Sequence, residues 1–154
     1  MESALGDAAP PSGPDLCAGV PIGDVATHKP FAGHVGDEAV MLVRLGDEIV
    51  ALGSACTHYG GNLADGLIEG ETVVCPLHHA CFSLRTGSAL GAPAFDPVRR
   101  WTVEVRDGIA FVRAPKPPQK APARRFPGVE TILVVGGGAA GFAWAERARR
   151  FVLY

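Results

Sequence analysis

Short apolar runs separated by glycine, proline and charged residues occupy most of the chain up to residue 113. Residues 39–45 and 48–53 are two such runs, and Gly46-Asp47 between them predicts a tight hairpin turn. Residues 99–105 alternate apolar and polar positions before a second predicted turn, Arg106-Asp107-Gly108, which leads into residues 109–113. Many short antiparallel strands, with no α-helix before Ala114, indicate an all-β domain. Further strands are expected at Val20 and Ile22 and at residues 31–35, 72–74 and 80–84.

Changes in composition along the chain predict the domain boundaries. Residues 1–15 are rich in Ala, Pro, Gly and Asp and are expected to form a disordered tail. The β domain then covers residues 16–113, and the prolines of residues 114–127 predict an extended linker. Residues 128–154 contain an apolar run, a group of glycines and an Ala-rich stretch that predicts a helix up to Arg150.

The glycines of this last segment fit a nucleotide-binding fingerprint. Gly136, Gly138 and Gly141 follow the G-x-G-x-x-G pattern between an expected strand and an expected helix. Small residues there let the backbone approach a pyrophosphate at the helix N-terminus. We therefore expect the truncated start of an FAD- or NAD-binding Rossmann domain, with these glycines as its cofactor-binding positions. FAD binding is expected only of a complete domain, because no second strand or acidic ribose partner follows.

Composition and charge narrow the possible functions. The length of 154 residues allows one domain, or one domain and a fragment. The chain is 47% hydrophobic and carries a formal net charge of −2. Residues 1–112 carry a balance of −8 and residues 113–154 a balance of +6. The β domain shows no basic patch, so nucleic-acid binding is not expected. No Ser-His-Asp set or carboxylate pair supports hydrolytic chemistry.

Cellular location is inferred from segments that the sequence lacks. No apolar run is long enough to span a membrane, and residues 1–15 lack the basic and apolar regions of a signal peptide. Four cysteines in such a chain indicate metal ligands before disulfides. We therefore expect a cytoplasmic protein without a membrane partner, and the sequence leaves its oligomeric state open.

Two short segments carry the candidate chemistry. Cys56-Thr57-His58 and Cys75-Pro76-Leu77-His78 each offer one thiolate and one imidazole, and sixteen residues separate them. Two sulfur and two nitrogen ligands on separate loops suit a mixed-ligand iron–sulfur centre. A zinc site is the alternative, because zinc also accepts two Cys and two His. Zinc modules more often pair C-x₂₋₄-C with H-x₃₋₅-H, so the spacing favours the cluster.

These two segments resemble the two sequence motifs of the Rieske family. Residues 56–63 (CTHYGGNL) look like the first motif, and residues 75–87 (CPLHHACFSLRTG) look like the second. The resemblance implies a Rieske-type ISP domain of antiparallel strands with two cluster-binding loops and a [2Fe–2S] cluster. One iron would be held by Cys56 and Cys75, and the other by His58 and His78. His79 is expected to point to solvent or to cap a carbonyl group.

The whole arrangement narrows the resemblance further. A Rieske domain, a proline-rich linker and a Rossmann start are together similar to the apoptosis-inducing-factor-like oxidoreductases, which are Rieske flavoproteins related to ferredoxin reductases. This resemblance implies electron transfer within an FAD-dependent oxidoreductase, with a flavoprotein reductase domain or a redox protein as partner. A stand-alone Rieske ferredoxin that feeds an oxygenase and a zinc-stabilised, non-redox binding domain are the alternatives. Flavin-dependent activity is not expected of this chain by itself.

The reduction potential can also be anticipated from the resemblance. High-potential members join the two loops by a disulfide at the positions of Gly61 and Leu77. They also place Ser and Tyr hydroxyl groups at the positions of Ala80 and Phe82. None of these groups is present here. Because fewer hydrogen bonds to sulfur disfavour the reduced, more negative cluster, we expect a low, ferredoxin-like potential.

Overall fold

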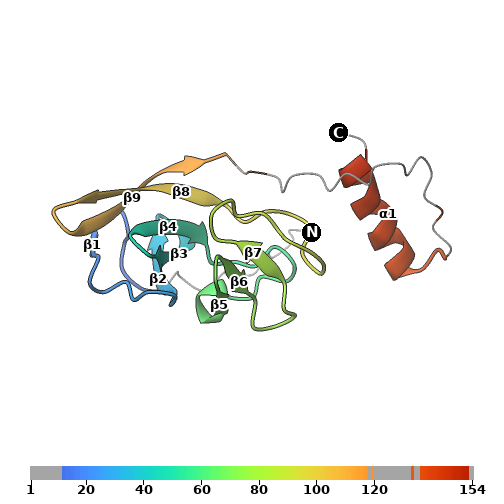
Figure 1. The fold of residues 1–154 in the computed structure, drawn as a ribbon, viewed down its shortest axis with the longest axis horizontal. Helices are drawn as coiled ribbons and strands as arrows, with labels where there is room; N and C mark the ends of the chain where they lie inside the picture. The colour runs from blue at the N-terminus through green and yellow to red at the C-terminus, as the bar shows by residue number, and fades with distance from the viewer. Residues whose placement is uncertain (1–11, 118, 120–132, 134–135, 153–154) are drawn as a thin grey trace, which may run out of the picture. The chain divides into compact units, whose positions relative to one another are not determined.

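Two antiparallel sheets make up the first of two compact units in the chain (Figure 1). The computed structural model describes residues 12–117, 119, 133 and 136–152, and the units are residues 1–119 and 120–154. The larger sheet has the strand order β1-β9-β8-β4-β3-β2, and the smaller has the order β5-β6-β7. The all-β prediction is therefore confirmed.

The elements follow one another as short strands, as the sequence predicts. The larger sheet contains β1 (Val20–Pro21), β2 (Phe31–Val35), β3 (Glu38–Leu45), β4 (Glu48–Gly53), β8 (Arg100–Arg106) and β9 (Ile109–Lys116). The smaller sheet contains β5 (Leu67–Glu69), β6 (Thr72–Val74) and β7 (Cys81–Ser83). A 3₁₀ turn, η1 (Leu63–Asp65), precedes β5, and the helix α1 (Ala139–Val152) lies in the second unit. Neither β5 nor η1 could be predicted from the sequence, because three-residue elements carry too little periodicity.

Both predicted hairpins form at turns whose residues suit the required backbone. Gly46 has a φ of 63° between β3 and β4. Between β8 and β9, Asp107 and Gly108 have φ values of 49° and 76°. Positive φ at both central residues matches the right-handed twist of the paired strands, which explains the Asp-Gly sequence there.

The last residues of the expected N-terminal tail are ordered, because they contact the larger sheet. The backbone N–H of His34 donates to the Pro14 carbonyl at 3.0 Å, and Asp15 forms a parallel bridge with His34 on β2. Residues 12–15 are thus fixed against the edge of the larger sheet, which corrects the tail boundary at residue 15. The remainder of the tail, residues 1–11, lies outside the described residues.

The expected linker also begins later than predicted. β9 continues through residues 114–116, because Pro115 pairs with Trp101 and Lys116 pairs with Arg100 on β8. The two units divide after Gln119. Pro115 is compatible with a strand here because β1 pairs with β9 only at Ile109 and Ala110. At Pro115 β9 is therefore an edge strand, where proline is tolerated.

Two hydrophobic cores lie on opposite sides of β3. Val40 and Leu42 belong to one core, and Met41 and Val43 belong to the other. All four side chains are completely buried, and each such burial contributes about 1.5–3 kcal/mol. The core that contains Met41 and Val43 also contains Cys56 and Cys75. The larger sheet therefore supports the two candidate ligand loops through this core.

The second unit contains the helix expected after the glycines. α1 begins at Ala139, and Gly136 has a φ of 116° just before it. Leu133 belongs to the apolar run of residues 130–135 and is in no strand; the rest of that run lies outside the described residues. A Rossmann start thus stays a prediction. None of the described helices has the length and apolar character that crossing a bilayer demands.

Candidate metal centre

The first candidate ligand loop is a tight turn closed by two backbone hydrogen bonds. The N–H of Cys56 donates to the Gly61 carbonyl at 2.9 Å, and the N–H of Gly60 donates to the Cys56 carbonyl at 2.8 Å. Gly60 has a φ of 69°, which turns the chain back toward Gly61. His58 therefore projects from the middle of a loop that is anchored at both ends.

The second loop repeats this geometry position by position. The N–H of Cys75 donates to the Ala80 carbonyl at 2.8 Å, and the N–H of His79 donates to the Cys75 carbonyl at 3.1 Å. His79 has a φ of 59° and so occupies the left-handed position that Gly60 occupies in the first loop. The two cysteines begin equivalent turns, which explains how distant segments present matching ligands.

This equivalence predicts the effect of replacing His79. A non-glycine residue in the left-handed region pays about 1–2 kcal/mol, and glycine pays about 0.5–1 kcal/mol in chain entropy. His79→Gly is therefore expected to raise the free energy of unfolding by up to about 1 kcal/mol. Thermal melting followed by circular dichroism measures this change.

The matched variant is Gly60→Ala in the first loop. It introduces the strain that His79→Gly removes, and the added methyl group meets no other atom within 4 Å. It is expected to lower the free energy of unfolding by about 1 kcal/mol. Equal melting temperatures for both variants and the parent protein would refute the equivalence of the two loops.

The two cysteine sulfurs lie together in the core. Cys56 and Cys75 are 4% and 1% exposed and form no disulfide. Burial raises the pKa of the Cys56 thiol and the neighbouring Cys75 sulfur raises it further, while hydrogen bonds from the backbone N–H groups of His58 and Tyr59 lower it. A buried thiol pair of this kind becomes a thiolate pair when a cation balances the charge.

The two candidate histidines also form a pair. The ring centroids of His58 and His78 are 5.0 Å apart, with the rings almost perpendicular. His58 Nδ1 is buried and has no hydrogen-bond partner among the described residues. Tyr59 packs its ring against both imidazoles, at 4.7 and 5.8 Å, yet is 76% exposed. A buried ring nitrogen without a hydrogen-bond partner fits a nitrogen that binds a metal instead.

Gly61 keeps the space beside the sulfur pair open. A Cβ atom at this position would lie 3.0 Å from Cys75 Sγ and 2.9 Å from Leu77 Cδ1. The contact also places residues 61 and 77 side by side, as the resemblance to a disulfide-bearing pair of loops implied. Any side chain at residue 61 would press on the sulfur of Cys75, a candidate ligand.

The donor set fits a two-iron cluster. The four predicted ligands form a sulfur pair and an imidazole pair, so each pair can serve one iron. Across residues 12–117, 119, 133 and 136–152, no three His, Cys, Asp or Glu side chains are placed to hold one metal ion together. The four candidate ligands are thus described as one sulfur pair and one imidazole pair.

Sequence reasoning missed one residue that holds the first loop. Thr57 Oγ1 donates a hydrogen bond to the Asp96 carbonyl at 2.7 Å. This bond joins the loop to a segment 39 residues further along the chain. No local pattern signals such a contact, because Thr57 looks like an ordinary loop residue between two ligands.

A match to a known protein family identifies the family of this chain. The family model described as the Rieske [2Fe–2S] domain matches residues 18–102, more than half of the chain. The chain belongs to the Rieske family. Its Rieske domain is thus the folded β unit, and the [2Fe–2S] cluster is the cofactor of that family.

Known proteins similar to this Rieske domain include two ferredoxins of dioxygenases. Human apoptosis-inducing factor 3 is 32% identical over 129 residues, covering 76% of this chain and 21% of that protein. The ferredoxin subunit of anthranilate 1,2-dioxygenase from Burkholderia cepacia is 33% identical over 87 residues, covering 56% of this chain and 81% of the subunit. The ferredoxin of carbazole 1,9a-dioxygenase from Nocardioides aromaticivorans has a TM-score of 0.60 at 30% identity, covering 66% of this chain and 95% of that structure.

The chain thus spans about a fifth of apoptosis-inducing factor 3 and most of each ferredoxin. Family and relatives agree on electron transfer through a Rieske cluster, and this is the function of the domain. The zinc-stabilised, non-redox alternative is not favoured. FAD binding and the cofactor-binding roles of Gly136, Gly138 and Gly141 stay predictions.

Proposed function

We propose that Cys56 and Cys75 hold one iron of the cluster and that His58 and His78 hold the other. The observation that carries this proposal is the repeated loop geometry, which brings one sulfur pair and one imidazole pair together. Once bound, the cluster takes up and releases one electron at a time. The buried cysteines anchor it on the core side, and the more exposed histidines lie on the solvent side.

The surface around the histidines suits exchange with another protein. His78, Tyr59 and Leu77 are exposed, the latter two by 76% and 57%. Exposed aromatic and apolar side chains next to ligands allow close approach of a partner without a substrate pocket. We infer that an electron enters and leaves at this face.

We further propose that the domain is the iron–sulfur module of an FAD-dependent oxidoreductase. The similarity to apoptosis-inducing factor 3 extends over 129 residues, which exceeds the 85 positions of residues 18–102 in the family match. α1 begins next to Gly138, with Gly136 and Gly141 on either side, as a dinucleotide fingerprint requires. In a complete Rossmann domain these glycines would face the pyrophosphate of FAD.

A second candidate is a ferredoxin that passes electrons to an oxygenase. The chain covers 95% of the carbazole dioxygenase ferredoxin structure, which supports this reading for the β unit alone. Both candidates imply a redox protein partner, and the cytoplasmic location expected from the sequence stays a proposal.

Anaerobic stopped-flow reduction tests the flavin-linked proposal. With an NADH-reduced ferredoxin reductase as donor, the visible bands of the protein are expected to bleach, because the proposed module exchanges electrons with a flavin. Bleaching by dithionite without bleaching by the flavoprotein would contradict the flavin-linked proposal. Rapid reoxidation by an oxygenase component, with no reduction by the flavoprotein, would select the second candidate.

The proposed cluster is expected to have a low potential. Ala80 and Phe82 are completely buried in the core that holds both cysteines, and neither has a hydroxyl group to donate to sulfur. Protein-film voltammetry is expected to give a midpoint in the lower half of the family range of about −150 to +300 mV. Phe82→Tyr is expected to raise it by about 40 mV, the equivalent of about 1 kcal/mol for one electron.

Phe111→Tyr is the matched control, because Phe111 lies on β9 outside that core. It should leave the midpoint unchanged. A parent midpoint in the upper half of the range would overturn the inference from the missing hydroxyl groups.

A further inference from the structure

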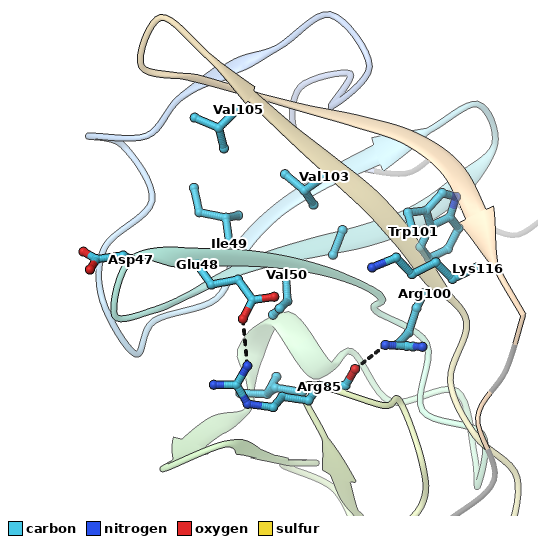
Figure 2. A pocket seen from close by; sticks show the side chains of 12 residues that line it. Asp47, Glu48, Ile49, Val50, Arg85, Arg100, Trp101, Val103, Val105 and Lys116 are labelled. Carbon is cyan, nitrogen blue, oxygen red and sulfur yellow. Dashed lines mark hydrogen bonds and ion pairs between the residues drawn. The ribbon is translucent and has the colours of Figure 1, made fainter.

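The larger sheet is split between two of its neighbouring strands. β4 and β8 pair only at Ala51 with Trp101 and at Leu52 with Arg100. Beyond these pairs the strands diverge, so residues 48–50 and residues 103–105 face each other across a groove (Figure 2). Each of these segments is paired on its other side, with β3 and β9 respectively. The groove therefore has an open strand edge along each wall.

The groove has the dimensions of a binding site. Its volume is about 560 Å³, within the range of about 300–1,000 Å³ found for ligand sites. None of its lining residues belongs to loop 56–61 or loop 75–80. An occupant would therefore leave the loops of the proposed metal centre free.

One side of the groove is apolar. Ile49, Val103 and Val105 gather above β4 in Figure 2, and they line the groove together. Val105 is 50% exposed, whereas Ile49 is nearly buried. An apolar side chain placed between them would cover surface that now meets water, which stabilises binding in proportion to the area covered.

The other side of the groove carries unbalanced positive charge. Arg100 and Lys116 stand directly opposite each other on β8 and β9, an arrangement that is unfavourable for like charges. Among the described residues neither has a carboxylate partner, and Arg100 Nε is buried without any hydrogen-bond partner. Arg100 does donate one hydrogen bond to the Arg85 carbonyl.

The remaining charges in the groove do not offset this pair. Arg85 is already bound to Glu48 at 2.7 Å and to Glu71 at 2.6 Å. Asp47 lies at the opposite end of the groove from Lys116 (Figure 2). A carboxylate between Arg100 and Lys116 would relieve their repulsion and satisfy the buried Nε atom.

We propose that the split between β4 and β8 binds an extended acidic segment of a partner protein as an added strand. Successive side chains of a strand point to opposite faces. Alternating apolar and acidic residues would therefore meet the apolar side at Ile49 and Val105 and the basic side at Arg100 and Lys116. The open edges supply backbone hydrogen bonds, as in other cases of strand addition.

Binding in the groove would hold the partner protein at a site separate from the electron-transfer face. A partner held in the groove keeps access to His58 and His78, so binding there would raise the local concentration of the redox partner. The peptide measurement below does not depend on the cluster ligands. Its failure would thus leave the proposed electron transfer untouched.

Fluorescence anisotropy with the intact protein and a fluorescein-labelled peptide of three Glu-Val repeats tests the proposal. Saturable binding is expected, and the peptide of three Lys-Val repeats is expected to bind at least tenfold more weakly. This preference runs against the overall charge, because residues 1–112 carry a balance of −8. A peptide with N-methylated valines, which cannot donate backbone hydrogen bonds at those positions, should also bind at least tenfold more weakly.

Two charge-matched variants locate the site. Lys116→Glu is expected to weaken binding of the Glu-Val peptide at least tenfold, whereas Lys29→Glu, on an exposed turn outside the groove, should change it less than twofold. Absence of saturable binding would overturn the proposal. So would equal affinity for the Lys-Val peptide, full affinity of the N-methylated peptide, displacement by inorganic phosphate at constant ionic strength, or equal effects of the two variants.

Discussion

His78→Ala is expected to abolish the cluster, with iron and acid-labile sulfide falling at least tenfold per protein chain. The imidazole of His78 lies 5.0 Å from that of His58 and completes the nitrogen pair. Without it one iron keeps a single protein ligand, and the binding energy that the cluster adds to folding is lost with it. Chemical iron and sulfide analysis, with the visible absorption spectrum, measures the effect.

The neighbouring residue provides the control for this variant. His79→Gly removes an imidazole one position away, from a residue that contributes its backbone N–H to the Cys75 carbonyl. Its iron, sulfide and spectrum are expected to match those of the parent protein. An intact spectrum in His78→Ala, or loss of the cluster in His79→Gly, would refute the ligand assignment.

Gly61→Val is expected to prevent cluster assembly almost as completely. The first side-chain carbon would already lie 3.0 Å from Cys75 Sγ and 2.9 Å from Leu77 Cδ1. Leu77 is exposed and can move aside, whereas Cys75 is buried in the core. Crowding of this kind costs about 1–3 kcal/mol, and here it falls on the sulfur of a proposed ligand. Iron content after anaerobic reconstitution is expected to fall at least tenfold.

Gly91→Val is the matched control. An added Cβ at Gly91 would meet no other atom within 4 Å, and its backbone is not in the left-handed region. It should take up iron as the parent does. Full reconstitution of Gly61→Val would show that the sulfur pair does not need the space that Gly61 leaves.

The ligand loops could be predicted because their determinants are local. Cys56, His58, Cys75 and His78 stand at short, fixed spacings, and each loop is closed by hydrogen bonds within six residues. The β3–β4 and β8–β9 hairpins were predictable for the same reason, since Gly46 and the Asp107-Gly108 pair mark their turns. Local sequence therefore indicated most of the fold and proposed the four ligands, whose assignment stays a prediction.

Features that depend on distant residues could not be predicted. The bond from Thr57 to Asp96 spans 39 positions, and the split beside β8 depends on where that strand stops pairing with β4. The left-handed backbone of His79 was not anticipated either, because its likeness to Gly60 shows only in the hydrogen bonds and φ values of the two loops. The end of the N-terminal tail near Pro14 and the end of β9 at Lys116 were misplaced by a few residues, because pairing across the sheet, and not composition, sets them.

Pulsed electron paramagnetic resonance of the dithionite-reduced protein tests the central claim most directly. Its signal reports both the cluster and the nuclei bound to it. The ligand assignment predicts a [2Fe–2S]⁺ signal with couplings to two histidine nitrogens, which change when the protein is grown with ¹⁵N-labelled histidine. A cluster signal without nitrogen couplings, or a colourless protein with stoichiometric zinc and no signal, would contradict it.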